Sequence, residues 1–228
     1  MNKQPSRHAG VLFDIDGTLI DSNYLHALAW WRALKDSGHR VPMYRIHRLI
    51  GMGSDKLLQE LLGEYSEDVS EIYSEYFRPL REEVVRFEGV HDLLREVHSR
   101  GVMVVLATSA KKEDLDVFMK VLDADDAIDH VTSSADVDES KPSPDVFETA
   151  LKATGLPKDN VVAVGDTVWD VKAAGELGIE CICVETGGIA RQELEEAGAV
   201  AVFRDVRELL DNLEAGPMGK LFGGARVR

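Results

Sequence analysis

Short apolar runs alternate with longer amphipathic segments along most of the chain. The first four runs are rich in β-branched residues and lack polar alternation, which is typical of strands buried on both faces. The runs are Val11–Asp14, Val102–Ala107, Val161–Val164, Cys181–Val184 and Val200–Phe203. Because segments with helical spacing lie between them, the pattern predicts an α/β fold, a Rossmann-like parallel sheet core flanked by helices.

The segments between the runs carry helix start and stop signals. Val90–Arg100, Ala173–Leu177 and Glu193–Ala197 each end just before a glycine, as helices often do. Glu113–Leu122 places four apolar residues on one helical face. Ser143–Asp145 reads as an N-cap, a first-turn proline and an acidic second position, so we expect a helix to begin there.

One segment, from Ser22 to about Phe87, has helical patterns and no convincing strand. Its apolar positions recur at helical spacing in three stretches. These are Leu25, Leu28, Ala29 and Ala33; Leu57, Leu58, Leu61 and Leu62; and Val69, Ile72, Tyr73, Tyr76, Phe77 and Leu80, with Pro79 favouring a kink in the last. We expect a helical insert over residues 22–87 and a discontinuous core over residues 1–21 and 88–228; helices packed on the sheet are the alternative. Residues 216–228, with four glycines, are expected to form a flexible tail.

The composition and net charge of the chain argue against some classes of binding partner. Of the 228 residues, 44% are hydrophobic, which suits one large domain or one domain with a small insert. Acidic residues outnumber basic ones by 41 to 26, and the net charge of −15 makes nucleic acid and anionic membranes poor partners. A phosphate-binding site in this chain must therefore carry its own local positive charge.

The sequence indicates a cytoplasmic protein. No apolar stretch approaches the ~20 residues needed to cross a bilayer, and Met1–Gly10 lacks an apolar signal core. Cys181 and Cys183 would face the same side of a strand, which is poor geometry for a disulfide and too few ligands for a zinc site. The oligomeric state, monomer or homodimer, is left open.

Candidate chemistry begins with Asp14-Ile15-Asp16-Gly17-Thr18-Leu19, directly after the first apolar run. In an open parallel sheet, ligands bind beyond the carboxyl ends of the strands. Ile15 separates Asp14 from Asp16, so the chain must leave strand geometry for both carboxylates to face one ligand, and Gly17 permits such a turn. An acidic strand-end turn without function is the alternative.

A second acidic pair follows the run that ends at Val164. Asp166 lies at the expected strand end, and Asp170 lies four residues further, on the same helical face if the helix starts at once. Asp166 alone would be read as a helix N-cap. Two unit charges 4 Å apart repel by roughly 4 kcal/mol at an effective dielectric of 20, so Asp14, Asp16, Asp166 and Asp170 would need a cation to stay ionised together. Oxygen ligands and few protein contacts favour Mg²⁺.

Two further elements could bind phosphate. Lys141 lies just before an expected helix start, where its ammonium could hold the nucleophile and a phosphate together, although in isolation a solvated loop lysine is the simpler interpretation. Thr108 and Ser109 follow the run that ends at Ala107 and precede a helix, a junction whose hydroxyl and N–H groups bind phosphate oxygens or simply cap the helix.

The order of these elements resembles the haloacid-dehalogenase-like superfamily from about Val11 to Leu210. Asp14–Leu19 is similar to its first motif, Thr108 to its second, Lys141 to its third, and Gly165-Asp166 with Asp170 to its fourth. The helical insert resembles the cap placed after the first motif in phosphoglycolate-phosphatase-like and β-phosphoglucomutase-like members.

The resemblance implies a role for each motif residue. Asp14 would form an aspartyl-phosphate, and Asp16 would act as general acid and then as general base. Mg²⁺ would bind the Asp14 carboxylate, the Asp16 backbone carbonyl and Asp166, with Asp170 as a direct ligand or holding a metal-bound water. Thr108, the Ser109 N–H and Lys141 would bind the phosphoryl group.

The resemblance also points to the insert. His26 would lie close to the acid/base aspartate, with a locally hydrogen-bonded helix histidine as an equal alternative. Gly51, Gly53 and Lys56 join two insert helices where similar enzymes face substrate, although an ordinary glycine-rich linker is the simpler interpretation.

Three functions are compatible with these residues. The first is a phosphatase acting on a small phosphorylated metabolite, because an aspartate at position 16 suits ester cleavage with a poor leaving group. The second is a sugar-phosphate mutase, which His26 and the Arg48–Gly51 stretch keep open. The third is a non-enzymatic signalling domain phosphorylated on Asp14, against which the insert and Asp16 argue.

Overall fold

The computed structural model describes residues 8–136, 140–214 and 216–222. Within these residues, six parallel strands form one sheet in the order β5-β4-β1-β6-β7-β8. The strands are β1 (Gly10–Phe13), β4 (Met103–Leu106), β5 (His130–Val131), β6 (Val161–Gly165), β7 (Glu180–Val184) and β8 (Ala201–Phe203). The predicted parallel α/β fold is therefore confirmed, and its carboxyl ends meet at one edge.

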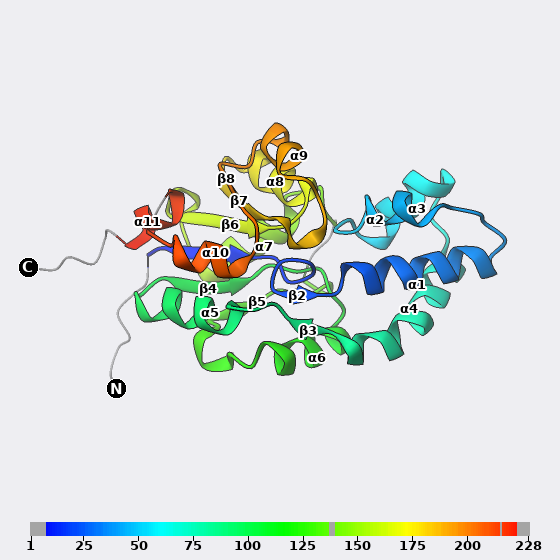
Figure 1. The fold of residues 1–228 in the computed structure, drawn as a ribbon, viewed down its shortest axis with the longest axis horizontal. Helices are drawn as coiled ribbons and strands as arrows, with labels where there is room; N and C mark the ends of the chain where they lie inside the picture. The colour runs from blue at the N-terminus through cyan, green and yellow to red at the C-terminus, as the bar shows by residue number, and fades with distance from the viewer. Residues whose placement is uncertain (1–7, 137–139, 215, 223–228) are drawn as a thin grey trace, which may run out of the picture.

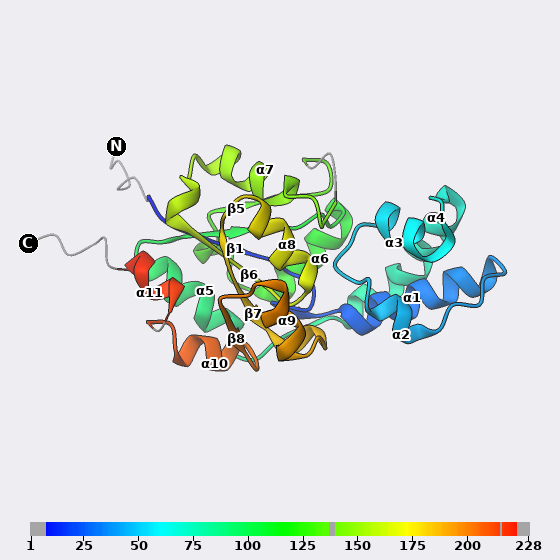
Figure 2. The same ribbon diagram turned by 90° about the horizontal axis from the view of Figure 1, so that it is seen from above.

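Helices cover both faces of this sheet (Figures 1 and 2). They are α5 (Val90–Ser99), α6 (Lys112–Leu122), α7 (Asp145–Thr154), α8 (Val168–Glu176), α9 (Arg191–Ala197), α10 (Val206–Asp211) and α11 (Pro217–Phe222). Successive strand residues face opposite sides: Phe13 packs with α5, α6, α10 and α11, whereas Leu12 packs with α7, α8 and α9. Burial on both faces explains why these strands read as unbroken apolar runs.

The insert forms four helices that extend away from the sheet (Figure 1). They are α1 (Asn23–Asp36), α2 (Met43–His47), α3 (Ser54–Leu62) and α4 (Glu67–Leu80). Their own apolar cluster includes Trp30, Ile46, Leu57 and Val69. The predicted face of α1 is partly wrong, because Ala33 packs in this cluster while Ala29 packs toward the sheet core.

Several local predictions differ from the structure. A two-stranded antiparallel ribbon of β2 (Ile20–Asp21) and β3 (Val85–Arg86) joins the insert to the core, and these strands are too short to show alternation. Helix α7 begins one residue later than expected, with Pro144 as its N-cap. Short 3-10 turns lie at η1 (Arg81–Glu83), η2 (Asp125–Ala127), η3 (Lys158–Asn160) and η4 (Glu185–Gly187).

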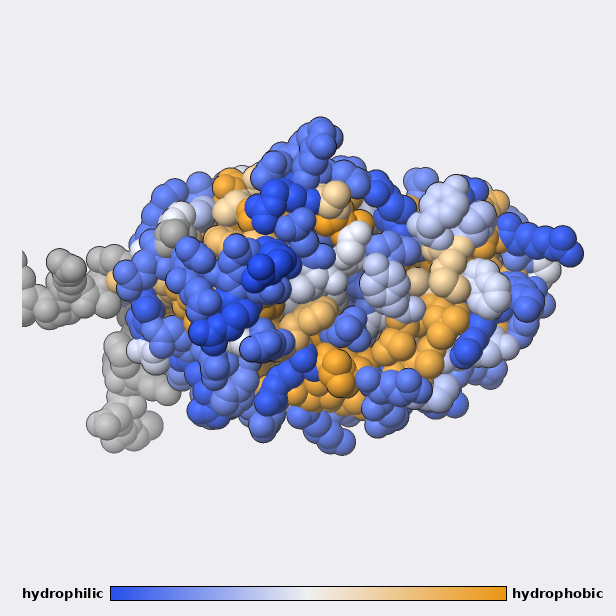
Figure 3. Space-filling view, viewed as in Figure 1, coloured by the Kyte–Doolittle hydropathy of each residue, from blue (hydrophilic) through white to orange (hydrophobic). Residues whose placement is uncertain are grey.

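The predicted flexible tail is wrong for its first part. Residues 217–222 form α11, because Met218 is fully buried in the core and the Arg100 guanidinium lies 4.7 Å from the Phe222 ring centre. Residues 223–228 lie outside the described part of the chain. No helix in the described residues has the length and apolar character that a bilayer-crossing segment needs. Figure 3 shows polar side chains over much of one face, with apolar ones gathered where the insert meets the core.

Candidate active site

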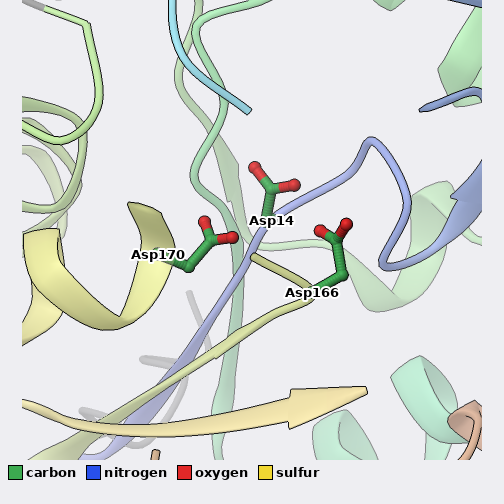
Figure 4. A group of neighbouring side chains, drawn as sticks. All are labelled: Asp14, Asp166 and Asp170. Carbon is green, nitrogen blue, oxygen red and sulfur yellow. The ribbon is translucent and has the colours of Figure 1, made fainter. Parts of the chain in front are cut away.

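Three aspartates meet at the carboxyl edge of the sheet (Figure 4). Asp14 follows β1, Asp166 follows β6, and Asp170 lies in the first turn of α8. One carboxylate oxygen from each lies within 4.8 Å of the others, and all three side chains are buried. Strand pairing fixes Asp14 here, since its N–H donates to the Val164 carbonyl at 2.8 Å. The structure thus brings together three of the four aspartates that the sequence predicted to share a cation.

Asp16 lies outside this carboxylate cluster. Its Oδ1 accepts a hydrogen bond from Ser22 Oγ at 2.6 Å and lies 3.0 Å from His26 Nε2. The chain turns between Asp14 and Asp16 with Gly17 at a φ of +73°. The side chain of Asp16 is 21% exposed, and both its contact with an ester and its metal contact through the backbone carbonyl stay predictions.

Lys141 is the cation of the site. Its Nζ forms a close ion pair with Asp14 and lies 2.7 Å from Asp170 Oδ1. The residue is 3% exposed, so the interpretation as a solvated loop lysine is wrong. Burial of an ammonium is tolerated here because two carboxylates face it.

The two aspartates of the first motif have opposite pKa shifts. Burial raises the pKa of Asp14 to about 7, with Lys141 opposing and the charges of Asp170 and Asp16 adding to the rise. Burial also acts on Asp16, but His26 and Ser22 outweigh it and lower the pKa of that carboxyl.

The surrounding charges explain the remaining shifts. Burial and repulsion from Asp170 and Asp14 raise the pKa of Asp166 well above its usual value. Burial would lower the pKa of Lys141, but Asp14 and Asp170 outweigh it and raise that pKa. One ammonium among these buried acids leaves negative charge uncompensated, which is what a site for a divalent cation requires.

Thr108 lies beside the end of β1. The Ala107 N–H donates to the Phe13 carbonyl at 2.7 Å, which continues the pairing of β4 with β1 up to the preceding residue. Thr108 is buried, and its Oγ1 accepts from the Ala110 N–H at 3.0 Å, so the hydroxyl proton stays a donor. Ser109 follows it ahead of α6. This junction follows β4, the strand next to β1, and contact of Thr108 or Ser109 with a phosphoryl group stays a prediction.

The insert reaches the site through His26. Its Nδ1 lies 2.7 Å from the Tyr73 hydroxyl, and its ring stacks on Phe77 with centres 4.0 Å apart. Of the two interpretations of His26, the structure supports the one that places it next to Asp16, at 3.0 Å.

The glycine-rich link of the insert contacts the core. A Cβ on Gly51 would lie 3.0 Å from Thr167 Oγ1, and one on Gly53 would lie 2.2 Å from Ser140 Cβ. Lys56 lines a groove of about 350 Å³ between α3 and the loop after Lys141. Contact of these residues with substrate stays a prediction, but both glycines are needed for the close approach.

Sequence reasoning missed the residues that hold Asp166. Thr18 Oγ1 donates to its Oδ1 at 2.9 Å, and Asn23 Nδ2 donates to its Oδ2 at 2.8 Å. A Cβ on Gly187 would lie 1.8 Å from that Oδ2. The available signal was the Gly187-Gly188 pair after a strand end, a place where backbone approaches a ligand site closely.

The sequence profile of the haloacid dehalogenase-like hydrolases matches residues 11–184, which contain every motif described above. The chain belongs to this family. It is therefore a haloacid dehalogenase-like hydrolase.

Relatives agree with this assignment. The chain is 29% identical over 216 residues to the chloroplastic protein SUPPRESSOR OF QUENCHING 1 of Arabidopsis thaliana, covering 90% of this chain and 20% of that protein. It is 26% identical to a phosphoglycolate phosphatase of Pseudomonas fluorescens, covering 88% of this chain and 78% of that one. The crystal structure of a hydrolase from Pseudomonas syringae is 32% identical, with a TM-score of 0.85 over 90% of this chain and 98% of that one. This hydrolase is an enzyme, and its relatives include a protein named phosphoglycolate phosphatase.

Proposed function

We propose that this hydrolase is a Mg²⁺-dependent phosphatase that cleaves a small phosphomonoester through an aspartyl-phosphate on Asp14. The observation that carries the proposal is the buried Asp14, which contacts Lys141 and shares one small volume with Asp166 and Asp170. A nucleophile needs to be held and kept from water, and this arrangement supports both.

The residues fit a magnesium ion. Asp14, Asp166 and Asp170 supply only oxygen ligands, and their oxygens lie within 4.8 Å of one another. Hard oxygen ligands with room for waters suit Mg²⁺, which when bound would neutralise charge that develops on the transferring phosphoryl group. Asp14 and Asp166 would hold it directly, and Asp170, in the first turn of α8, would bind it directly or hold a metal-bound water.

Different side chains act in the two chemical steps, formation of the aspartyl-phosphate and its hydrolysis. An oxygen of Asp14 attacks phosphorus, an O–P bond forms, and the bond from phosphorus to the ester oxygen breaks. The departing alkoxide takes a proton from the pair formed by Asp16 and His26, whose facing atoms are 3.0 Å apart. Asp16 then takes a proton from water, whose oxygen attacks phosphorus and releases phosphate and the Asp14 carboxylate. Lys141 and Thr108 would hold the phosphoryl oxygens.

The helical insert would act as the cap of this site. Contacts that join it to the core include His26 with Asp16, His47 Nε2 with the Gly187 carbonyl at 3.0 Å, Ser140 Oγ with Asp55 at 2.8 Å, and Arg48 with Glu193. Each of them would break when the insert swings away. We therefore propose that substrate enters with these contacts open and that they exclude water when closed.

The proposed substrate is a small phosphorylated metabolite. A relative is named phosphoglycolate phosphatase, and Asp14 itself is only 7% exposed. A sugar-phosphate mutase remains the second candidate, because the contact between His26 and Asp16 links insert position to the acid/base group. We expect the enzyme to act in a reducing, cytoplasmic compartment, since Cys181 and Cys183 are both free thiols.

Phosphate release from an aryl phosphate and from a panel of phosphorylated metabolites tests the proposal. Activity should require Mg²⁺, and Asp14→Asn should lower kcat by at least ~10³-fold because the nucleophile is lost. Asp211→Asn, the same change on the exposed surface of α10, is the matched control and should keep full activity. Full activity of Asp14→Asn would refute the nucleophile, and isomer formation without free phosphate from a sugar phosphate would favour the mutase.

A further inference from the structure

Asn23 is a buried polar residue in an unusual place. It is the first residue of α1, the helix that begins the insert, and it is 3% exposed. A short amide side chain is not a favoured helix residue, and one withdrawn from water must find hydrogen-bond partners. Helix formation therefore does not explain why an asparagine occupies this position.

The Asn23 amide faces two acceptors of the core. Its Nδ2 donates to Asp166 Oδ2 at 2.8 Å and approaches the Gly187 carbonyl at 3.5 Å. Because both are acceptors, only the NH₂ group of the amide can point toward them. Its Oδ1 is buried and has no hydrogen-bond partner among the described residues. Buried carbonyl oxygens normally have one, so a water or an ion's hydration shell is the natural partner.

The backbone of two glycines lies close against this contact. A Cβ on Gly17 would lie 2.2 Å from Asn23 Nδ2, and one on Gly187 would lie 1.8 Å from Asp166 Oδ2. Real Cβ atoms do not approach so closely, so the amide and the carboxylate are enclosed by bare backbone. The Asp166 carboxylate cannot rotate without displacing Asn23.

Both donors to Asp166 are neutral. Thr18 Oγ1 holds Oδ1 from the core at 2.9 Å, and Asn23 holds Oδ2 from the insert. Neutral donors fix the orientation of a carboxylate without cancelling its charge, so its attraction for a cation is kept. A lysine in place of Asn23 would hold Asp166 equally well and compete with the ion.

We propose that Asn23 is a positioning residue that holds Asp166 for the metal ion and thereby links ion binding to the first turn of the insert. The same turn supplies Ser22 and His26 to Asp16, so one helix end orients carboxylates with two different roles. Since coupling is reciprocal, bound Mg²⁺ stabilises this position of α1, and a displaced α1 weakens Mg²⁺ binding. The inference rests on the proposed metal site.

The test is calorimetric titration of the full chain with Mg²⁺ alone, without substrate. Asn23→Ala removes the amide, and Asn23→Leu removes it while keeping the branched shape of the side chain. Both should raise the Kd for Mg²⁺ about 10-fold, the lower end of the effect of losing a group that orients a metal ligand. Asn212→Leu makes the same change on an exposed residue after α10 and should bind as the unaltered chain does.

A second readout separates positioning from packing. The Mg²⁺ concentration that gives half-maximal phosphate release should rise by the same factor in both Asn23 variants, and excess Mg²⁺ should restore kcat to within a few-fold. A Kd for folded Asn23→Leu within about twofold of the unaltered chain would overturn the inference, because the side-chain shape rather than the amide would then matter. If Asn23→Ala does not fold, Asn23→Leu alone decides. If the unaltered chain binds no Mg²⁺, the proposed metal site itself fails, and that outcome is distinct from a failure of Asn23.

Discussion

The active site has a core side around Asp14 and an insert side around Asp16. The pKa values of these two neighbouring carboxylates shift in opposite directions. Asp14 belongs to the core side, where burial raises its pKa to about 7 and a single ammonium, Lys141, compensates it. Asp16 is two residues away, but Ser22 and His26 at the start of the insert lower its pKa. One sequence motif therefore supplies a carboxylate that needs a cation to ionise fully and another that is ionised by its neighbours.

This difference suits two chemical roles. A nucleophile with a pKa of about 7 is only partly ionised near neutral pH in the empty enzyme, and a bound cation would favour its ionised form. A carboxylate with a histidine and a hydroxyl as partners can give and take a proton within one cycle. Because the partners of Asp16 come from the insert, movement of the insert changes the acid/base group and leaves the nucleophile in place.

Removing the cation of the core side should have the largest effect. Lys141→Met leaves Asp14 and Asp170 buried without their ammonium, so we expect a loss of about 3 kcal/mol in the free energy of unfolding without Mg²⁺. Activity should fall by ~10³-fold, because the phosphoryl oxygens lose a donor. Denaturant unfolding and steady-state kinetics measure both quantities. Lys112→Met, at an exposed lysine on α6, should change neither, and a stable, active Lys141→Met would show that the core side does not depend on its ammonium.

The size of the loss in kcat on replacing Asp16, which forms the proton-donating pair of the insert side with His26, should depend on the substrate. Asp16→Asn should lower kcat for an alkyl phosphate by ~10²- to 10⁴-fold, because an alkoxide needs a proton to leave. An aryl phosphate has a better leaving group and should lose less in the first step. Rapid-quench measurement of the first turnover with both esters separates the effects. Equal losses for the two esters would contradict a proton-donating role for Asp16.

The sequence predicted the parts of this comparison that depend on strand ends. Asp14 and Asp166 could be placed because unbroken apolar runs mark doubly covered strands, and parallel strands end at one edge. The burial of Lys141 could not be predicted, since nothing in a loop sequence shows that two carboxylates will face it. The contacts of Asn23 and Gly187 join residues 164 positions apart, which no local periodicity encodes. The ribbon of β2 and β3 was missed because two residues are too few to show a period.

The pH dependence of Mg²⁺ binding should show a smaller effect. The pKa of Asp14 rises from 3.8 to about 7 on folding, so the native state holds this proton more tightly than the unfolded chain does. That contribution to stability is complete below about pH 4 and is lost as the pH rises through about 7. Mg²⁺ needs the ionised carboxylate and competes with the proton. A fixed Mg²⁺ concentration should therefore raise Tm more at about pH 8 than at about pH 5.5.

Asp14→Asn is the control for that prediction. It removes the titrating group, so the increase in Tm on adding Mg²⁺ should be smaller and should depend less on pH. The same increase at both pH values in the unaltered chain would mean that Asp14 is already ionised without the ion, and the contrast between the two carboxylates would be lost.

The most direct measurement of the central claim is mass spectrometry of acid-quenched enzyme during turnover of a phosphomonoester with Mg²⁺. We predict a phosphoryl group on the peptide that contains Asp14, absent from Asp14→Asn, which appears before phosphate is released and disappears as phosphate forms. Steady release of phosphate with no phosphorylated peptide at any quench time, together with retained activity in Asp14→Asn, would contradict the account.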